Sequence, residues 1–271
     1  MAARLTGKRC LIIGGTSGIG LAAAHLFLAE GAKLVVVGRD PPEAEQVRGV
    51  LVKEGPAHVV AAEVTKTDAV VRVMSAVVSQ MGGLDSLFHV AGGSGRQAGD
   101  GALHECTDDG WTTTLDLNLR SVFLTNRAVV RQFLSQRAGG AIVNTSSVLA
   151  FSPSPRHFDT CAYTAAKGGI VSLSRQAAAR YAADRIRVNV LAPGLTNTPM
   201  AARAVKDPAV AAYIKSKQPV VAGPISPQAC AEAAVFLCSD AARSITGAVL
   251  TVDGGWCVSE GQHGGSDPSD E

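Results

Sequence analysis

The segment spanning residues 10–20 constrains the fold more than any other part of this chain. Residues 10–13 are apolar, as in a buried parallel strand, and the next seven residues include four glycines. A helix-forming run follows and ends before Gly31. Glycine lets a ligand approach the backbone closely, and the unpaired amides at a helix N-terminus favour an anion such as phosphate. A strand, a glycine turn and a helix in this order predict a dinucleotide-binding turn.

The rest of the chain alternates in the same way. Short, β-branched apolar runs lie at residues 33–38, 58–62, 86–90, 141–145, 186–191 and 248–252, and helical segments lie at 41–54, 66–81, 107–135, 161–182 and 226–239. Nearly continuous apolar strands are typical of a parallel sheet covered on both faces. We therefore predict an α/β fold, a doubly wound parallel sheet of about seven strands with helices on both faces. We expect one domain over residues 1–256, followed by a disordered tail at 257–271.

Composition excludes several classes of function. The net charge is +2 and no basic stripe is interleaved with aromatics, so we expect no nucleic-acid partner. No apolar run reaches the ~20 residues of a membrane span, and the N-terminus is too polar for a secretory signal. The six cysteines form no C-x-x-C pair and the six histidines show no ligand spacing. We therefore expect free thiols, no metal site and a cytoplasmic protein.

In a doubly wound sheet the ligand lies at the carboxyl ends of the strands. After the second predicted strand, Gly38 leaves room and Arg39 is suited to pair with a 2′-phosphate, so the sequence favours NADP over NAD. Two alternatives stay open: Arg39 stacks on the adenine or points into solvent, and the neighbouring Asp40 binds the ribose of NAD.

Tyr163 and Lys167 are four residues apart on a predicted helix, so they share one face. A free tyrosine has a pKa near ~10, and a nearby ammonium favours the phenolate and lowers that value. The pair predicts a tyrosine that exchanges protons near neutral pH, although the spacing by itself is a common match.

Over residues 5–256 the chain resembles the short-chain dehydrogenase/reductase family, whose fold is of the Rossmann type. The motifs that carry the resemblance lie at residues 13–20 (IGGTSGIG), 89–92 (HVAG), 115–119 (LDLNL), 144–148 (NTSSV), 163–167 (YTAAK), 193–198 (PGLTNT) and 247–255 (GAVLTVDGG). Three departures stand out. Ile13 replaces a threonine, His89 and Val90 replace two asparagines, and Glu63 replaces an aspartate near the adenine. We interpret His89 as a core histidine whose ring nitrogens are satisfied.

The resemblance implies four catalytic residues. Tyr163 would be the general acid, Lys167 would lower its pKa and bind the nicotinamide ribose, and Ser147 would donate to the substrate oxygen. Asn118 would hold a water that links Lys167 to solvent. Ser146 is a rival for the role of Ser147. The implied cofactor contacts are Gly14, Thr16, Ser17, Gly18, Ile19, Gly20, Arg39, Glu63, Val64, Ala91, Gly92, Tyr163, Lys167, Pro193, Gly194, Leu195 and Thr198.

The function implied is an NAD(P)-dependent oxidoreductase that moves hydride between nicotinamide C4 and a ketone or secondary alcohol. We expect the small-molecule substrate to be chosen by loops 92–103, 149–160 and 197–224, with Met200, Tyr213 and Ile214 for apolar contact and Arg156 and His157 on a solvated loop. The resemblance also implies a homotetramer packed through the helices at 107–135 and 161–182. A non-catalytic NAD(P)-binding scaffold or sensor is the alternative, and a dehydratase or epimerase on the same fold is a second.

Overall fold

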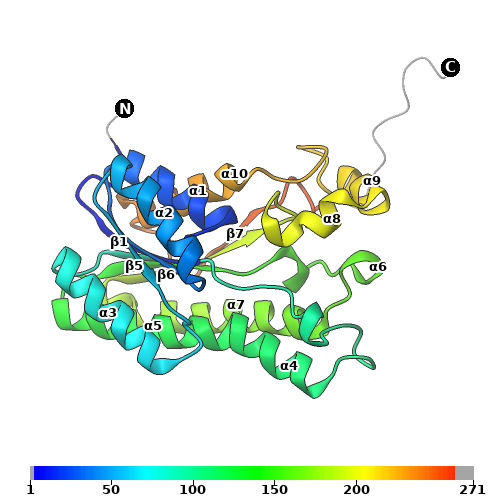
Figure 1. The fold of residues 1–271 in the computed structure, drawn as a ribbon, viewed down its shortest axis with the longest axis horizontal. Coiled ribbons are helices and arrows are strands. Elements are labelled where there is room, and N and C mark those ends of the chain that lie inside the picture. Colours follow the sequence, from blue (N-terminus) through cyan, green and yellow to red (C-terminus); the bar gives the residue numbers. More distant parts are fainter. Residues whose placement is uncertain (1–2, 260–271) are drawn as a thin grey trace, which may run out of the picture.

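Seven strands form one parallel sheet with helices on both faces (Figure 1). The computed structural model describes residues 3–259. The strands are β1 (Arg9–Ile13), β2 (Lys33–Gly38), β3 (Ala57–Ala61), β4 (Ser86–His89), β5 (Gly140–Thr145), β6 (Ile186–Pro193) and β7 (Val249–Val252). They lie in the order β3-β2-β1-β4-β5-β6-β7, and every neighbouring pair is parallel. The predicted doubly wound parallel sheet is confirmed.

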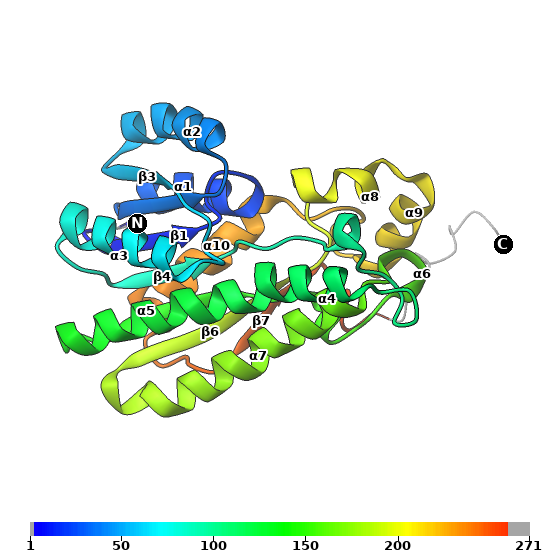
Figure 2. The same ribbon diagram turned by 60° about the horizontal axis from the view of Figure 1, so that its bottom comes forward.

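Two helical layers enclose the sheet (Figures 1 and 2). One face is covered by α1 (Gly18–Ala29), α2 (Pro41–Glu54) and α10 (Pro227–Cys238), the other by α3 (Thr67–Met81), α5 (Ser121–Gln136) and α7 (Cys161–Tyr181). The helix expected at 107–135 is interrupted: α4 (Asp108–Leu115) passes through a π-helical turn, Asp116–Arg120, into α5. Three short helices lie beyond the carboxyl ends of the strands, namely α6 (Pro155–Phe158), α8 (Ala202–Lys206) and α9 (Pro208–Lys217).

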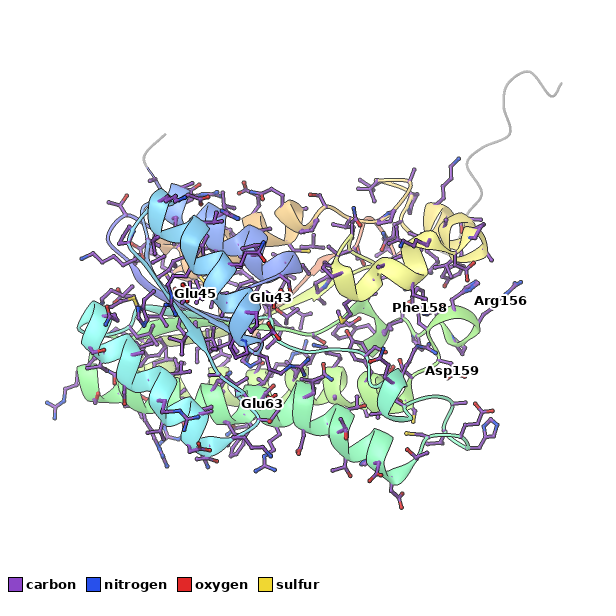
Figure 3. The ribbon with its side chains drawn as sticks, viewed as in Figure 1. Glu43, Glu45, Glu63, Arg156, Phe158 and Asp159 are labelled. Atoms are coloured by element: carbon purple, nitrogen blue, oxygen red, sulfur yellow. The ribbon has the colours of Figure 1, made fainter. Side chains whose placement is uncertain are left out.

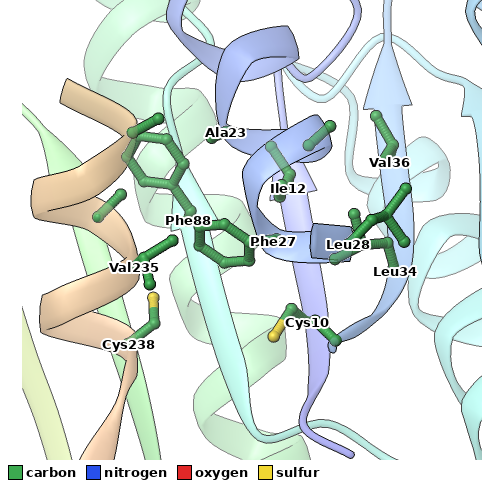
Figure 4. Close-up of a cluster of buried hydrophobic side chains, with 14 of the residues drawn as sticks. Cys10, Ile12, Ala23, Phe27, Leu28, Leu34, Val36, Phe88, Val235 and Cys238 are labelled. Atoms are coloured by element: carbon green, nitrogen blue, oxygen red, sulfur yellow. The ribbon is translucent and has the colours of Figure 1, made fainter. Parts of the chain in front are cut away.

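Each face of the sheet buries its own apolar core. On the side of α1 and α10, the rings of Phe27 and Phe88 stack with their centroids 6.4 Å apart, and Ile12 and Val235 belong to the same cluster (Figure 4). Complete burial of one such side chain contributes about 1.5–3 kcal/mol. Because both faces of the strands are buried, the strands are apolar at successive positions rather than at alternate ones.

The strand order creates a crevice beside β1. From β1 the chain moves to β2 and β3 on one side, and it then returns to β4 on the other side. The loops after β1 and β4 therefore run in opposite directions from the carboxyl ends of these strands and leave a crevice between them. Ligands bind at this position in such sheets. None of the helices within residues 3–259 has both the length and the apolar character needed to cross a membrane.

The segment after β7 packs back on the domain. The backbone N–H of Cys257 donates to Asp253 at 2.9 Å, and Lys217 Nζ donates to the carbonyl of Ser259 at 2.7 Å. The first three residues of the predicted tail at 257–271 are therefore held in place, and residues 260–271 lie outside the described residues.

Candidate active site

The glycine turn after β1 forms a backbone surface that is open to an anion. Ser17, the residue before α1, makes no side-chain capping bond, so the first amides of the helix are left without a side-chain partner. Gly18 has a positive φ of 51°. A Cβ at Gly20 would collide with the carbonyl oxygen of Gly14, so this close approach of backbone to backbone requires glycine. The exposed amides and the helix dipole fit the pyrophosphate of a nicotinamide dinucleotide.

A cleft of about 460 Å³ runs from this turn along the carboxyl ends of the strands. All the residues named above as cofactor contacts, from Gly14 to Thr198, line it, together with Ser147. Asn118 does not line the cleft; its neighbour Leu117 does. The cleft also includes residues that the sequence did not single out, namely Glu43, Ser94, Arg96, Phe158, Arg203 and Trp256.

Lys167 is a buried cation at the floor of the cleft. Its side chain is 3% exposed, and Nζ donates to the carbonyl oxygen of Thr145 at 3.0 Å. Burial lowers the pKa of Lys167 to about 8. Nζ lies 5.4 Å from the centroid of the Tyr163 ring. The two side chains are therefore neighbours on one face of α7, as their spacing predicts.

Tyr163 differs from expectation in its electrostatics. Burial raises the pKa of the phenol, and a hydrogen bond with Ser147 lowers it. Desolvation is the larger of these two causes, and the Lys167 ammonium is not among the groups that shift this pKa. The sequence predicts a lowered pKa for Tyr163, whereas the surrounding protein raises it.

The two adjacent serines after β5, Ser146 and Ser147, make different hydrogen bonds. Ser146 Oγ donates to the backbone carbonyl of Lys167 at 2.8 Å, so its proton is committed to α7. Ser147 Oγ accepts from the N–H of Leu149 at 3.2 Å and interacts with the phenol of Tyr163. This arrangement favours Ser147 over its rival as the donor to a substrate oxygen.

Asn118 lies behind the wall of the cleft, on the π-helical turn. Its Nδ2 donates to the carbonyls of Gly93 and Thr114, both at 2.9 Å, and its Oδ1 accepts from the N–H of Gly93 at 3.2 Å. A Cβ at Gly92 would lie 2.6 Å from Asn118 Oδ1 and 3.3 Å from Lys167 Nζ. The side chain thus holds the loop after β4 close to Lys167, and its amide groups are engaged with that loop rather than with the cleft.

The interpretation of His89 as a satisfied core histidine is wrong in one respect. The residue is buried at 1% exposure, but within residues 3–259 neither ring nitrogen has a hydrogen-bond partner. Burial and then the charge of Lys167 lower the pKa of His89 to about 3, so the ring is neutral at neutral pH. The neighbouring position on β5 is Asn144, whose amide bonds to Asn126 and Ser174 instead.

The N-terminus of α7 is capped from a distant loop. Asp100 Oδ1 accepts from the N–H of Ala162 and Oδ2 accepts from the N–H of Tyr163, each at 3.0 Å. Asp100, Cys106 and Cys161 come together here with their ligand atoms within 4.8 Å of one another, a grouping that sequence spacing did not predict. Asp100 lies at this position because its carboxylate caps the N-terminus of α7.

The far end of the cleft is built from the three loops expected to choose the substrate. Phe158 and Met200 line it, and Met200 is 60% exposed. The other two apolar residues expected there lie behind: Ile214 is fully buried, and Tyr213 packs edge-on against Trp256 at 5.7 Å. His157 stacks on Tyr213 at 4.7 Å, whereas Arg156 points away from the molecule (Figure 3).

At the opposite end, Arg39 and three acids line the cleft beside β2 and β3, namely Asp40, Glu43 and Glu63. Asp40 accepts from the N–H of Glu43 at 2.9 Å and so caps α2. The carboxylate of Glu43 accepts from Thr16 Oγ1 at 3.0 Å. Glu43 and Glu63 both lie on this side of the cleft, away from Phe158 (Figure 3).

Comparison with known proteins agrees with this geometry. A family model described as enoyl-(acyl carrier protein) reductase matches residues 14–257. Cis-4-hydroxycyclohexanecarboxylate dehydrogenase of Sinomonas cyclohexanicum is 38% identical over 248 residues, which cover 91% of this chain and 95% of that protein.

Solved structures are similar as well. A short-chain type dehydrogenase/reductase from Mycobacterium ulcerans matches with a TM-score of 0.86 and 28% identity, over 94% of this chain and 91% of that one. The 3-ketoacyl-(acyl-carrier-protein) reductase of Brucella melitensis, solved with NADH, matches with a TM-score of 0.82 and 31% identity, over 94% of this chain and 100% of that one. The chain therefore belongs to the short-chain dehydrogenase/reductase family and is an NAD(P)-dependent oxidoreductase acting on CH–OH or C=O groups.

Proposed function

We propose that Tyr163 is the general acid of this reaction, and the general base in the reverse direction. When bound, the nicotinamide supplies or accepts the hydride at the substrate carbon. The Tyr163 hydroxyl gives its proton to the substrate oxygen as negative charge develops there, and Ser147 donates a second hydrogen bond to the same oxygen. The observation that supports these roles most directly is the convergence of Ser147, Tyr163 and Lys167 on one cleft beside an anion-binding glycine turn.

Lys167 supports the proton transfer by its charge. With a pKa of about 8, its ammonium is protonated at neutral pH, and a cation this close to the phenol favours the phenolate left after transfer. One of its three N–H donors is used by Thr145. The remaining donors are available for the nicotinamide ribose, on the side where Gly92 lacks a Cβ.

The test replaces Tyr163 with phenylalanine. We expect kcat/KM to fall about 10²–10⁴-fold while the Kd for the cofactor changes little, because only the proton donor is lost. Tyr181→Phe is the matched control, since Tyr181 ends the same helix but does not line the cleft. Undiminished turnover by Tyr163→Phe would contradict the assignment and would favour the non-catalytic, cofactor-binding alternative.

For the cofactor we propose NADP. Arg39 lines the cleft where the adenosine ribose would lie, and within residues 3–259 its guanidinium forms no ion pair. Asp40 is used as a helix cap, which leaves Glu43 as the carboxylate that competes for this ribose. Arg39→Asp should weaken NADPH binding much more than NADH binding, and Glu43→Gln should weaken NADH binding more. Equal losses for both cofactors in Arg39→Asp would reject NADP.

For the substrate we propose a small cyclic alcohol or ketone. The relative from Sinomonas is a dehydrogenase of a hydroxycyclohexanecarboxylate, and Phe158, Met200 and Trp256 provide apolar surface at the far end of the cleft. Absorbance of NADPH and NADH, followed against a panel of ring alcohols and ketones, tests this proposal. Turnover of linear substrates alone would reject it.

We also propose a homotetramer in the cytoplasm. Trp111 and Phe123 are 41% and 44% exposed on α4 and α5. Phe123 also lines a shallow hollow, together with Leu115, Asp116, Leu119, Arg120 and Leu173. An apolar surface of this kind suits contact with a second copy. All six cysteines are free thiols, as suits a reducing compartment. Phe123→Glu should lower the mass measured by light scattering, and an unchanged mass would reject this interface.

A further inference from the structure

Two arginines stand at the substrate end of the cleft, on two different elements. Arg96 begins a 3₁₀ turn, Arg96–Ala98, in the loop after β4, and Arg203 lies on α8. Both line the same cleft as Tyr163. Both side chains are exposed to solvent at the mouth of the cleft. Burial and then the charge of Arg203 lower the pKa of Arg96, so Arg203 lies within electrostatic range of it. Two cations that face the same cleft favour the binding of an anion there.

The protein itself does not neutralise this pair. Within residues 3–259, neither arginine forms an ion pair or donates a side-chain hydrogen bond to a carboxylate. Two acids act on Arg96 more weakly than Arg203 does, namely Asp100 and Asp159. Both oxygens of Asp100 are already used by the amides of α7. Asp159 alone cannot balance two cations.

The cleft that the two arginines line also has an apolar wall. Phe158 and Trp256 pack against each other at 5.8 Å and both line the cleft, and Met200 precedes α8 on the same side. A ligand held here would place an apolar body against these rings and an anionic group at the guanidinium groups. Arginine is suited to carboxylates because its planar fork donates two parallel hydrogen bonds.

We propose that Arg96 and Arg203 together bind a carboxylate of the substrate, so that this enzyme acts on a cyclic hydroxy acid or the matching keto acid. This inference rests on the proposed function and specifies its substrate class. The other source of such an anion is the pyrophosphate of the cofactor, which has the same chemistry, and the experiment must separate the two.

The experiment measures binding rather than turnover. Cyclohexanecarboxylate and its neutral isostere cyclohexanecarboxamide are titrated by calorimetry into the complexes of wild type, Arg96→Gln and Arg203→Gln with NADP⁺. Wild type should bind the acid about 10- to 100-fold more tightly than the amide, because a charged hydrogen-bonded pair is lost in the amide. Each arginine variant should remove most of that difference. Arg156→Gln, an exposed arginine on α6 outside the cleft lining, should keep it.

Each other outcome overturns the proposal in a distinguishable way. Equal binding of acid and amide to wild type rejects a substrate carboxylate site. A loss of NADP⁺ affinity in both arginine variants, with the preference for the acid unchanged, assigns the pair to the cofactor pyrophosphate. Since the titration requires no turnover, a failure of Tyr163→Phe to lose activity would reject the proposed function without changing these results.

Discussion

The carboxylate of Asp100 accepts a hydrogen bond from the backbone N–H of Tyr163 at 3.0 Å, and its other oxygen accepts from the preceding residue. A residue of the loop after β4 therefore fixes the first turn of α7, the helix that bears the proposed proton donor. This contact joins a loop that we expect to contact the substrate to the backbone of Tyr163, the proposed proton donor.

Removal of this cap should weaken both the fold and the reaction. Asp100→Ala leaves two amides without an acceptor, so we expect the free energy of unfolding to fall by about 1–2 kcal/mol and kcat to fall as well. Asp100→Asn keeps one acceptor oxygen and should fall between Ala and wild type. Urea denaturation and steady-state kinetics measure these effects. Asp159→Ala is the control, because it also removes a charge that acts on Arg96 but does not cap α7. Equal effects of Asp100→Ala and Asp159→Ala would show that charge, not capping, matters.

The buried lysine should make stability depend on alkaline pH. Lys167 has a pKa of about 8 when folded and an ordinary value of 10.5, so between these values the unfolded chain binds more protons. The free energy of unfolding should therefore gain about 3 kcal/mol from this group as pH rises from 8 to 10.5. Lys167→Met should remove that gain and be more stable at pH 7. Denaturant titrations of both proteins across this range test the difference, and parallel curves would refute it.

His89 should make the fold sensitive to acid. Its pKa is lowered to about 3 when folded, against an ordinary value of 6.5, so the unfolded chain binds the extra proton between these values. The free energy of unfolding should therefore fall by roughly 1.4 kcal/mol per pH unit as the pH is lowered from 6.5 towards 3. His89→Leu removes two unpaired nitrogens and should be more stable and less acid-sensitive. His58→Leu, at a half-buried position on β3, is the control and should retain the acid sensitivity of wild type.

Substitution by alanine should have opposite effects at two helical glycines, Gly20 and Gly49. A Cβ at Gly20 meets the carbonyl of Gly14, so Gly20→Ala should distort the turn and weaken cofactor binding at least about tenfold. A Cβ at Gly49, on α2, meets nothing within 4 Å. Gly49→Ala should stabilise the protein by about 0.5–1 kcal/mol and leave cofactor binding unchanged. Cofactor fluorescence and thermal denaturation distinguish the two, and normal cofactor affinity in Gly20→Ala would contradict the tight-turn interpretation.

Much of the fold follows from local sequence. The predicted ranges 33–38 and 41–54 coincide with β2 and α2, and Ser226 caps α10 as a serine before a proline should. Parallel strands buried on both faces produce continuous apolar runs, and the helices between them need only one apolar stripe. These signals depend on neighbours within a few residues, so they can be recognised in the sequence without a structure.

What the sequence by itself determined is the alternation of strands and helices, the glycine turn and the spacing of Tyr163 from Lys167, because each is a short-range pattern. Only the tertiary structure decided that Asp100 caps α7, that Arg96 and Arg203 line the same cleft and that His89 lacks partners. These relationships join residues from separate loops and strands. Desolvation, which raises the pKa of Tyr163, depends on all the groups packed around the side chain. The physical reason is that burial and long-range contact are properties of the packed chain, and no local pattern encodes them.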